Sequence, residues 1–169
     1  MARPRSFDEP EVLDQLLQAF WDRGFEGTSM TDLVEATGLQ KGSLYNAFGD
    51  KEQIYFRALD HYHEGIEAHL GGLFSKNPGS EGIRAWLDLL LQLCRGAAGK
   101  RGCFAANAVA ERATTDPRVR KLVHQHELRL RGILKDAVAD AQRAGEIDSG
   151  PEAQQLADLL WTVATGLRL

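Results

Sequence analysis

Apolar residues recur at helical spacing along almost the whole chain, and no segment alternates convincingly with a period of two. This pattern predicts amphipathic helices that bury their apolar faces against one another, with no strands to form a sheet. Capping residues, prolines and glycines divide it into eight expected helices, at about 8–23, 30–37, 40–48, 51–74, 81–98, 103–113, 117–144 and 151–169. The sequence therefore predicts an all-α fold.

Size and composition limit the class of protein. The chain has 169 residues, of which 43% are hydrophobic and 26% are charged, the balance of a globular protein of one or two domains. Its two cysteines, Cys94 and Cys103, are too few for a secreted disulfide scaffold and favour a reducing compartment. The apolar runs are too short for a membrane span, and the first residues lack the apolar stretch of a secretory signal. We therefore expect a cytoplasmic protein with no membrane partner.

Two unusually short helices are expected between residues 28 and 51. Ser29 precedes the first and forms a capping-box pattern with Asp32, while Thr37-Gly38-Leu39 is a tight turn leading into the second. Helices of seven or eight residues are not stable alone, so these must pack against the longer helices before and after them. This order of helices and this turn are typical of a helix-turn-helix unit.

The second short helix has a polar face that suits double-stranded DNA. Lys41 can neutralise a phosphate, Tyr45 offers a hydroxyl and a flat ring, and the amides at 40 and 46 can hydrogen-bond base edges. Small residues at 42 and 43 allow a close approach to the groove, and Arg3 and Arg5 precede the first helix, within reach of the DNA. The candidate face comprises Gln40, Lys41, Gly42, Ser43, Tyr45 and Asn46. The alternative is a surface helix with an ordinary polar face.

Bulk charge does not favour nucleic acid. The net charge is −4, and residues 1–60 contain 6 Lys+Arg against 11 Asp+Glu, a balance of −5. DNA binding by this part of the chain must therefore depend on where the few cations are placed. The acidic balance supports a second hypothesis, a helical small-molecule binding module or enzyme that has kept the head and lost its DNA role.

The short-helix region also resembles a known family. It carries the pattern Phe20-x4-Phe25-x2-Thr28-Ser29-Met30-x-Asp32-Leu33-Val34-x2-Thr37-Gly38-Leu39-x-Lys41-Gly42-Ser43-Leu44-Tyr45-x2-Phe48-x2-Lys51-Glu52-x2-Tyr55. Over residues 8–60 this is similar to the N-terminal domain of the TetR (tetracycline repressor) family. The resemblance implies a dimeric, all-helical, ligand-responsive transcriptional regulator with a DNA-binding domain at 1–49 and a ligand-binding and dimerisation domain at 50–169.

Carried over position by position, the resemblance assigns roles to the candidate residues. It implies phosphate contacts at Thr28 or Ser29, Lys41, Tyr45 and Lys51. It implies base-facing positions at Gln40, Gly42, Ser43 and Asn46, although the family commonly has His where this chain has Asn46. Two heads of a homodimer would enter major grooves about 34 Å, or a multiple of it, apart, so the operator should be roughly palindromic.

The body is less distinctive. Residues 102–111 and 116–119 resemble a branch of the family that often controls efflux pumps or detoxifying enzymes. The family usually ends in two helices that pair with the partner subunit, and only the first is found here, at 151–169. Because the apolar pattern of this helix is unfinished, we expect a further helix. The alternative is a frayed natural terminus. An apolar or aromatic inducer is expected between the long helices, with candidate contacts at Tyr62, Ile66, Phe74, Trp86, Leu90, Cys103, Phe104, Asn107, His126 and Trp161. The alternative for each is an ordinary core residue.

The cysteines and histidines raise two further kinds of site. Cys103 lies at a helix start beside Lys100 and Arg101, which favours a reactive thiolate and a sensor role, whereas a small residue filling a helix contact is the alternative. The histidine pairs at 61/63 and 124/126 are two apart and do not share a helix face, and no zinc-type spacing is present. No nucleophile motif or glycine-rich phosphate loop is found. We therefore expect no metal, no cofactor and no catalytic residue.

Overall fold

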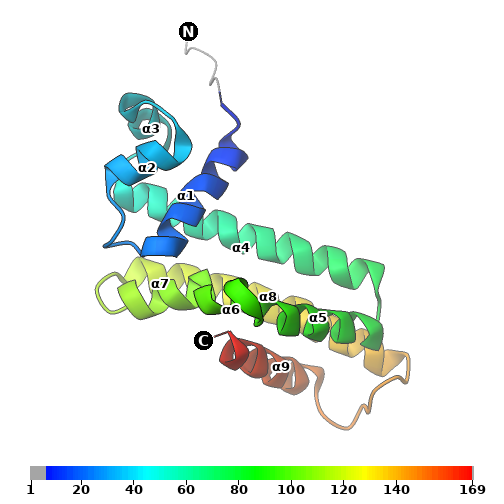
Figure 1. Ribbon diagram of the computed structural model, residues 1–169. Coiled ribbons are helices and arrows are strands. Elements are labelled where there is room, and N and C mark those ends of the chain that lie inside the picture. Colours follow the sequence, from blue (N-terminus) through cyan, green and yellow to red (C-terminus); the bar gives the residue numbers. More distant parts are fainter. Residues whose placement is uncertain (1–6, 169) are drawn as a thin grey trace.

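The computed structural model (Figure 1) describes residues 7–168, apart from the side chains of residues 97 and 98. Within this range the chain forms nine α-helices and no strand, so the all-α expectation is confirmed. The helices are α1 (Glu9–Arg23), α2 (Met30–Thr37), α3 (Lys41–Phe48), α4 (Lys51–Lys76), α5 (Ser80–Leu93), α6 (Gly96–Arg101), α7 (Phe104–Arg112), α8 (Pro117–Arg143) and α9 (Ala153–Leu167). Arg3 and Arg5, expected to reach the DNA, lie outside the described residues.

The prediction of a single helix at 81–98 followed by a break at 99–102 is wrong. α5 ends at Leu93, and the short α6 occupies Gly96–Arg101. Gly96 has a φ of +67°, a left-handed value that allows the chain to turn between the two helices. The turn could not be predicted from periodicity, because the apolar residues of the sequence continue past it without a change of spacing.

Helices α1, α2 and α3 form a head at one end of the molecule (Figure 1). The predicted capping box at α2 is confirmed: the Ser29 hydroxyl accepts from the backbone of Asp32, and the Asp32 carboxylate accepts from the backbone of Ser29 at 2.7 Å. α2 ends at Gly38, whose φ is +64°. Leu33 and Leu44 are completely buried in the first hydrophobic core, which holds the two short helices against α1 and α4.

α4 connects the head to the rest of the chain. It begins with a second capping box, in which Asp50 and Gln53 each bond the other's backbone N–H, at 2.9 and 3.0 Å. Its 26 residues span about 39 Å at 1.5 Å per residue. The first core continues along its buried face and includes Phe104 of α7 and Val119 of α8. Because this core crosses residue 50, the division into domains at 49/50 stays a prediction.

The remaining helices form the body. α8 packs against α4, α5, α7 and α9, and a second core lies between α4, α5, α8 and α9 around Trp86 and Leu134. One face of α9 stays apolar and exposed, at Leu159, Val163 and Leu167. None of the helices in residues 7–168 combines the length and hydropathy that crossing a membrane requires.

Candidate DNA-binding surface and ligand cavity

The polar face of α3 is open to solvent. Leu44 and Phe48 turn into the core, which leaves the other side of this two-turn helix free. All six residues of the candidate face are exposed, including Tyr45 at 41%. The helix begins after Gln40 without a side-chain cap, so its first N–H groups have no capping partner among the described residues. A helix N-terminus carrying a lysine is suited to a phosphate.

Gly42 has no structural reason to be glycine. A Cβ built there meets no atom within 4 Å, and its φ is not positive. A glycine inside a helix lowers helix stability by about 1 kcal/mol relative to alanine. Gly42 therefore weakens the helix without relieving any contact, which is consistent with the close approach of a DNA backbone to this face.

The other candidate phosphate contacts differ in availability. Thr28 is buried, and its hydroxyl donates to the Gly24 carbonyl at 2.6 Å, so it acts within the head. Ser29 is exposed at the start of α2, although its hydroxyl caps that helix. Lys51 begins α4 with its Nζ 4.3 Å above the Phe25 ring. Of the Thr28 and Ser29 alternatives, Ser29 is therefore the better placed.

A large cavity of about 800 Å³ lies where the head meets the body. Its lining is mainly aliphatic and aromatic, and it comes from α1, α4, α5, α7, α8 and α9. Six predicted ligand residues line it: Tyr62, Ile66, Trp86, Leu90, Cys103 and Trp161. Both the size and the apolar lining are those of a small-molecule site.

Four of the predicted ligand residues do not line this cavity. Phe104 is buried among the rings of Trp21, Tyr55 and Tyr62 in the first core. Phe74 packs against the second core, and Asn107 is exposed. His126 is buried between two carboxylates of α4, with Nδ1 2.6 Å from Glu67 and Nε2 2.8 Å from Asp60. These residues have local structural partners, which the periodic pattern could not distinguish from a ligand.

Sequence reasoning missed the contribution of the head to the cavity. Asp14, Leu17 and Trp21 of α1 line it, as does Arg168 next to the end of α9. Trp21 could have been noticed, because α1 carries this aromatic residue beside its main apolar stripe. The contribution of α1 means that a ligand in the cavity would touch the head directly.

Cys103 occupies the N-cap of α7 and is half-buried in the cavity wall. Its Sγ lies 3.5 Å from the Tyr62 hydroxyl. The sensor role of this thiol stays a prediction.

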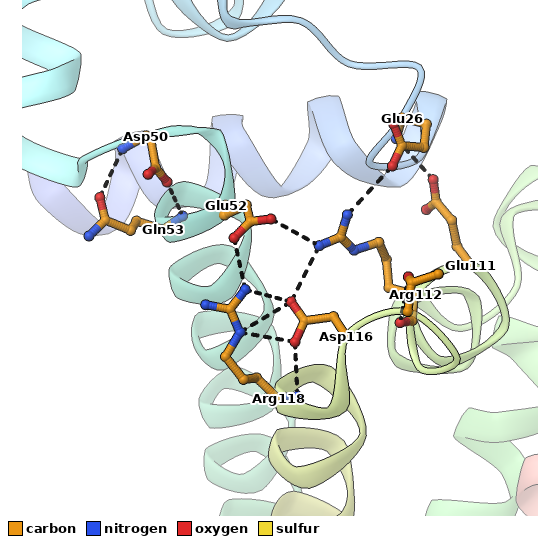
Figure 2. Close-up of polar contacts among 9 residues, drawn as sticks. Glu26, Asp50, Glu52, Gln53, Glu111, Arg112, Asp116 and Arg118 are labelled. Atoms are coloured by element: carbon orange, nitrogen blue, oxygen red, sulfur yellow. Dashed lines mark hydrogen bonds and ion pairs between the residues drawn. The ribbon is translucent and has the colours of Figure 1, made fainter.

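A cluster of charged residues joins the body to the head (Figure 2). Arg112, at the end of α7, bonds Asp116 at 3.3 Å and Glu52 of α4 at 3.4 Å. Arg118 of α8 bonds the same two carboxylates, at 2.7 and 2.8 Å. We call Glu26, Glu52, Glu111, Arg112, Asp116 and Arg118 the linkage cluster.

The linkage cluster also holds the loop between α1 and α2. The Glu111 carboxylate accepts the backbone N–H groups of Phe25 and Glu26 at 2.9 and 3.0 Å. The Arg112 guanidinium lies 3.8 Å from the centre of the Phe25 ring and 3.5 Å from the Glu26 carboxylate. Because Val109 and Ala110 of the same helix line the cavity, α7 contacts both the ligand site and the head.

Protonation of Asp116 at acidic pH should lower the stability of the protein. Hydrogen bonds from Arg118, then from Arg112, help lower the pKa of this buried carboxyl to about 2. The pKa of aspartate in an unfolded chain is about 3.9. The contribution of Asp116 to stability is therefore complete above pH about 4 and is lost as the pH falls towards 2.

We expect Asp116→Asn to remove this acid-dependent loss of stability while keeping a side chain that can cap α8. Urea unfolding at intervals between pH 5 and 2 measures it. The free energy of unfolding should fall more steeply in the wild type than in the variant; parallel curves would contradict the assignment.

His63 and His126 form a second buried contact between α4 and α8. Their rings stack at 4.1 Å, and the Nδ1 atom of His63 is 2.8 Å from the Leu59 carbonyl. Burial, followed by the electrostatic effect of the neighbouring His126, lowers the pKa of His63 to about 4, so His63 is neutral near pH 7. No group of metal-ligating side chains is found in the part of the chain that the structure describes.

Comparison with known proteins identifies the family. Residues 79–169 match the family described as "Tetracyclin repressor-like, C-terminal domain", and residues 12–58 match "Bacterial regulatory proteins, tetR family". The HTH-type transcriptional repressor ComR of Escherichia coli (strain K12) is 28% identical over 169 residues, which cover 99% of this chain and 80% of ComR.

Solved structures agree with the family matches. A cysteine mutant of the TetR family transcriptional regulator CifR, complexed with 26-base-pair double-strand operator DNA, superposes with a TM-score of 0.81 at 27% identity, covering 98% of this chain and 87% of that one. The reduced form of E. coli NemR has the same fold, with a TM-score of 0.80 at 21% identity and coverage of 92% and 85%. The first family match covers more than half of the chain, and the chain therefore belongs to the TetR family of DNA-binding transcriptional regulators.

Proposed function

We propose that this protein is a homodimeric transcriptional repressor that leaves a roughly palindromic operator when a small molecule enters its cavity. The observation that carries the proposal is the exposed polar face of α3, which begins with Lys41 at an uncapped helix N-terminus. Operator DNA bound to the similar CifR, and the repressor ComR, support it. The proposed repressor acts in the cytoplasm, where its operator is. We propose no catalytic role for it.

The exposed apolar face of α9 supports the dimer. Leu159, Val163 and Leu167 are 59%, 45% and 44% exposed, and they follow one another at intervals of four residues. A stripe at this spacing on one helix suits packing against a second helix. In the proposed dimer, the two α3 helices would enter successive major grooves.

The cavity and the linkage cluster support release by a ligand. A ligand shifts an equilibrium only if it binds one conformation better than another. The cavity is shared by α1 and α7, and α7 holds the α1–α2 loop through Glu111 and Arg112. A ligand that displaces α7 would therefore change how the head sits on the body. Genes for efflux or detoxification are the proposed targets, because residues 102–111 and 116–119 resemble the branch of the family that often controls such genes.

A titration of fluorescent duplex DNA from upstream of the protein's own gene, followed by anisotropy, tests the proposal. A repressor of this class should bind with a dissociation constant of about 10⁻⁸ M or tighter at physiological salt, with two chains per site. Binding no tighter than to a scrambled duplex would instead support the module or enzyme that has lost its DNA role.

Gly42→Ala separates the functional and structural interpretations of α3. We expect the variant to be more stable by about 0.5–1 kcal/mol, because alanine favours the helix and has room there. We also expect operator affinity to fall, because the new methyl group occupies the face that approaches DNA. Urea unfolding and the anisotropy titration measure the two effects.

Gly72→Ala is the matched control, since Gly72 lies in α4, far from the head, and also has no atom within 4 Å of a built Cβ. It should gain stability and keep operator affinity. If Gly42→Ala also keeps full affinity, α3 is an ordinary surface helix.

A further inference from the structure

The charged residues lining the cavity indicate which charge its ligand carries. Most of the wall is apolar and includes Trp21, Trp86 and Trp161, so the ligand must have an apolar body. Charged groups in such a wall need partners, because an unpaired charge is costly away from water. A lining charge without a partner in the protein therefore indicates the charge of the ligand.

The acidic lining residues have partners. The Asp14 carboxylate lies 2.8 Å from Nε2 of His61. The Glu127 carboxylate accepts from Arg131 at 2.6 Å and from the Trp161 indole at 2.7 Å. Neither carboxylate requires a cation from a ligand, because Asp14 is also 67% exposed to water and Glu127 is paired with Arg131.

Arg168, unlike the acidic lining residues, has no oppositely charged partner among the described residues. Its guanidinium donates to the Tyr62 hydroxyl at 3.1 Å, and no carboxylate of the described residues pairs with it within 4.0 Å. It is half-buried and lines the cavity. An arginine is always charged and has five donors, so one hydroxyl leaves most of its capacity unused. The flat guanidinium fits the two oxygens of a carboxylate.

We propose that the inducer is an apolar carboxylic acid whose carboxylate binds Arg168 and the Tyr62 hydroxyl. Its apolar part would extend from these two residues between the tryptophans of the cavity. The inference rests on the proposed function, since it takes this cavity to be the inducer site. It goes further by assigning the ligand's charge and the residue that recognises it.

Three ligands with the same hydrocarbon chain test the assignment: decanoate, decanamide and decylamine. Isothermal titration calorimetry on the full chain should show decanoate binding about 10-fold or more tightly than decanamide, as expected for a hydrogen-bonded ion pair. Decylamine should bind most weakly, because it brings a cation to Arg168. Equal affinities, a preference for the amine, or no binding of any of the three would overturn the proposal.

Two variants locate the preference. Arg168→Gln should lower decanoate affinity to that of decanamide and leave decanamide affinity unchanged. Arg143→Gln is the control, because Arg143 is exposed at the end of α8 and pairs only with Asp140 among the described residues. It should keep the full preference; a preference that survives in Arg168→Gln contradicts the role of Arg168.

Operator binding distinguishes this inference from the function on which it rests. If the free protein binds its operator but shows no preference for decanoate, the carboxylate assignment is wrong and the repressor proposal stands. If decanoate is preferred but specific operator binding is absent, the repressor proposal is wrong. If both hold, decanoate should release the DNA from the wild type at concentrations that leave the Arg168→Gln complex intact.

Discussion

Lys41→Glu is expected to weaken operator binding by about 100-fold or more without unfolding the protein. The side chain is exposed at the start of α3, so the substitution removes no buried contact. A hydrogen bond to a charged group contributes about 1.5–3 kcal/mol, and a dimer would lose one such contact in each of its two heads. The glutamate would also repel the phosphates that the lysine attracts.

The salt dependence of binding gives this prediction a second measurement. Each lost phosphate contact lowers the slope of log K against log salt by about one, so the dimer should lose about two. Lys76→Glu has the same change of charge at the far end of α4 and should bind normally. Normal affinity in Lys41→Glu, or an equal loss in Lys76→Glu, would exclude α3 as the contact surface.

Asp116→Ala is expected to have the largest effect on stability, a loss of about 3 kcal/mol or more. The substitution removes the cap of α8, the bonds from Arg118 and the closest partner of the buried Arg112. Removing one partner from a buried ion pair typically costs about 3–5 kcal/mol. Glu52 and Glu26 still face Arg112 in the variant, so we expect a loss near the lower end of that range. For a chain of this size, about 3 kcal/mol corresponds to a fall of about 6–12 °C in the unfolding temperature.

Asp140→Ala is the matched control for this experiment. Asp140 lies on the same helix and also pairs with an arginine, Arg143, but both side chains are exposed. A surface pair of this kind contributes about 0–1 kcal/mol. Calorimetric unfolding of the two variants should differ by several degrees; equal unfolding temperatures would show that the linkage cluster adds no more stability than an ordinary surface pair.

The local features of the fold could be predicted because local sequence determines them. Ser29 with Asp32, and Gly38 three residues before Lys41, give the start and end of α2 without any knowledge of the rest of the molecule. The exposed face of α3 was predictable for the same reason, since two buried residues in a two-turn helix leave only one face for solvent. The role of Thr28 was harder to predict, because its burial depends on a hydrogen bond to Gly24 that no sequence pattern specifies.

The cavity was predicted only in part because it depends on how distant helices are rotated about their axes. Periodicity gives the apolar side of α7 and α8 but not which neighbour covers each residue. Phe104 and His126 therefore have structural partners, whereas Trp21 of the head and Arg168 near the other end of the chain meet in one cavity. The linkage cluster was missed for the same reason, since Glu52 and Asp116 are 64 positions apart in sequence.

Hydroxyl-radical footprinting of the protein on its operator shows where the two heads bind along the DNA. We expect two protected patches on one side of the duplex, with centres separated by about 34 Å or a multiple of it. Both patches should disappear together in Lys41→Glu at the protein concentration that saturates the wild type. A single protected patch, or two patches that persist in the variant, would show that the protein does not bind DNA as a dimer through its α3 helices.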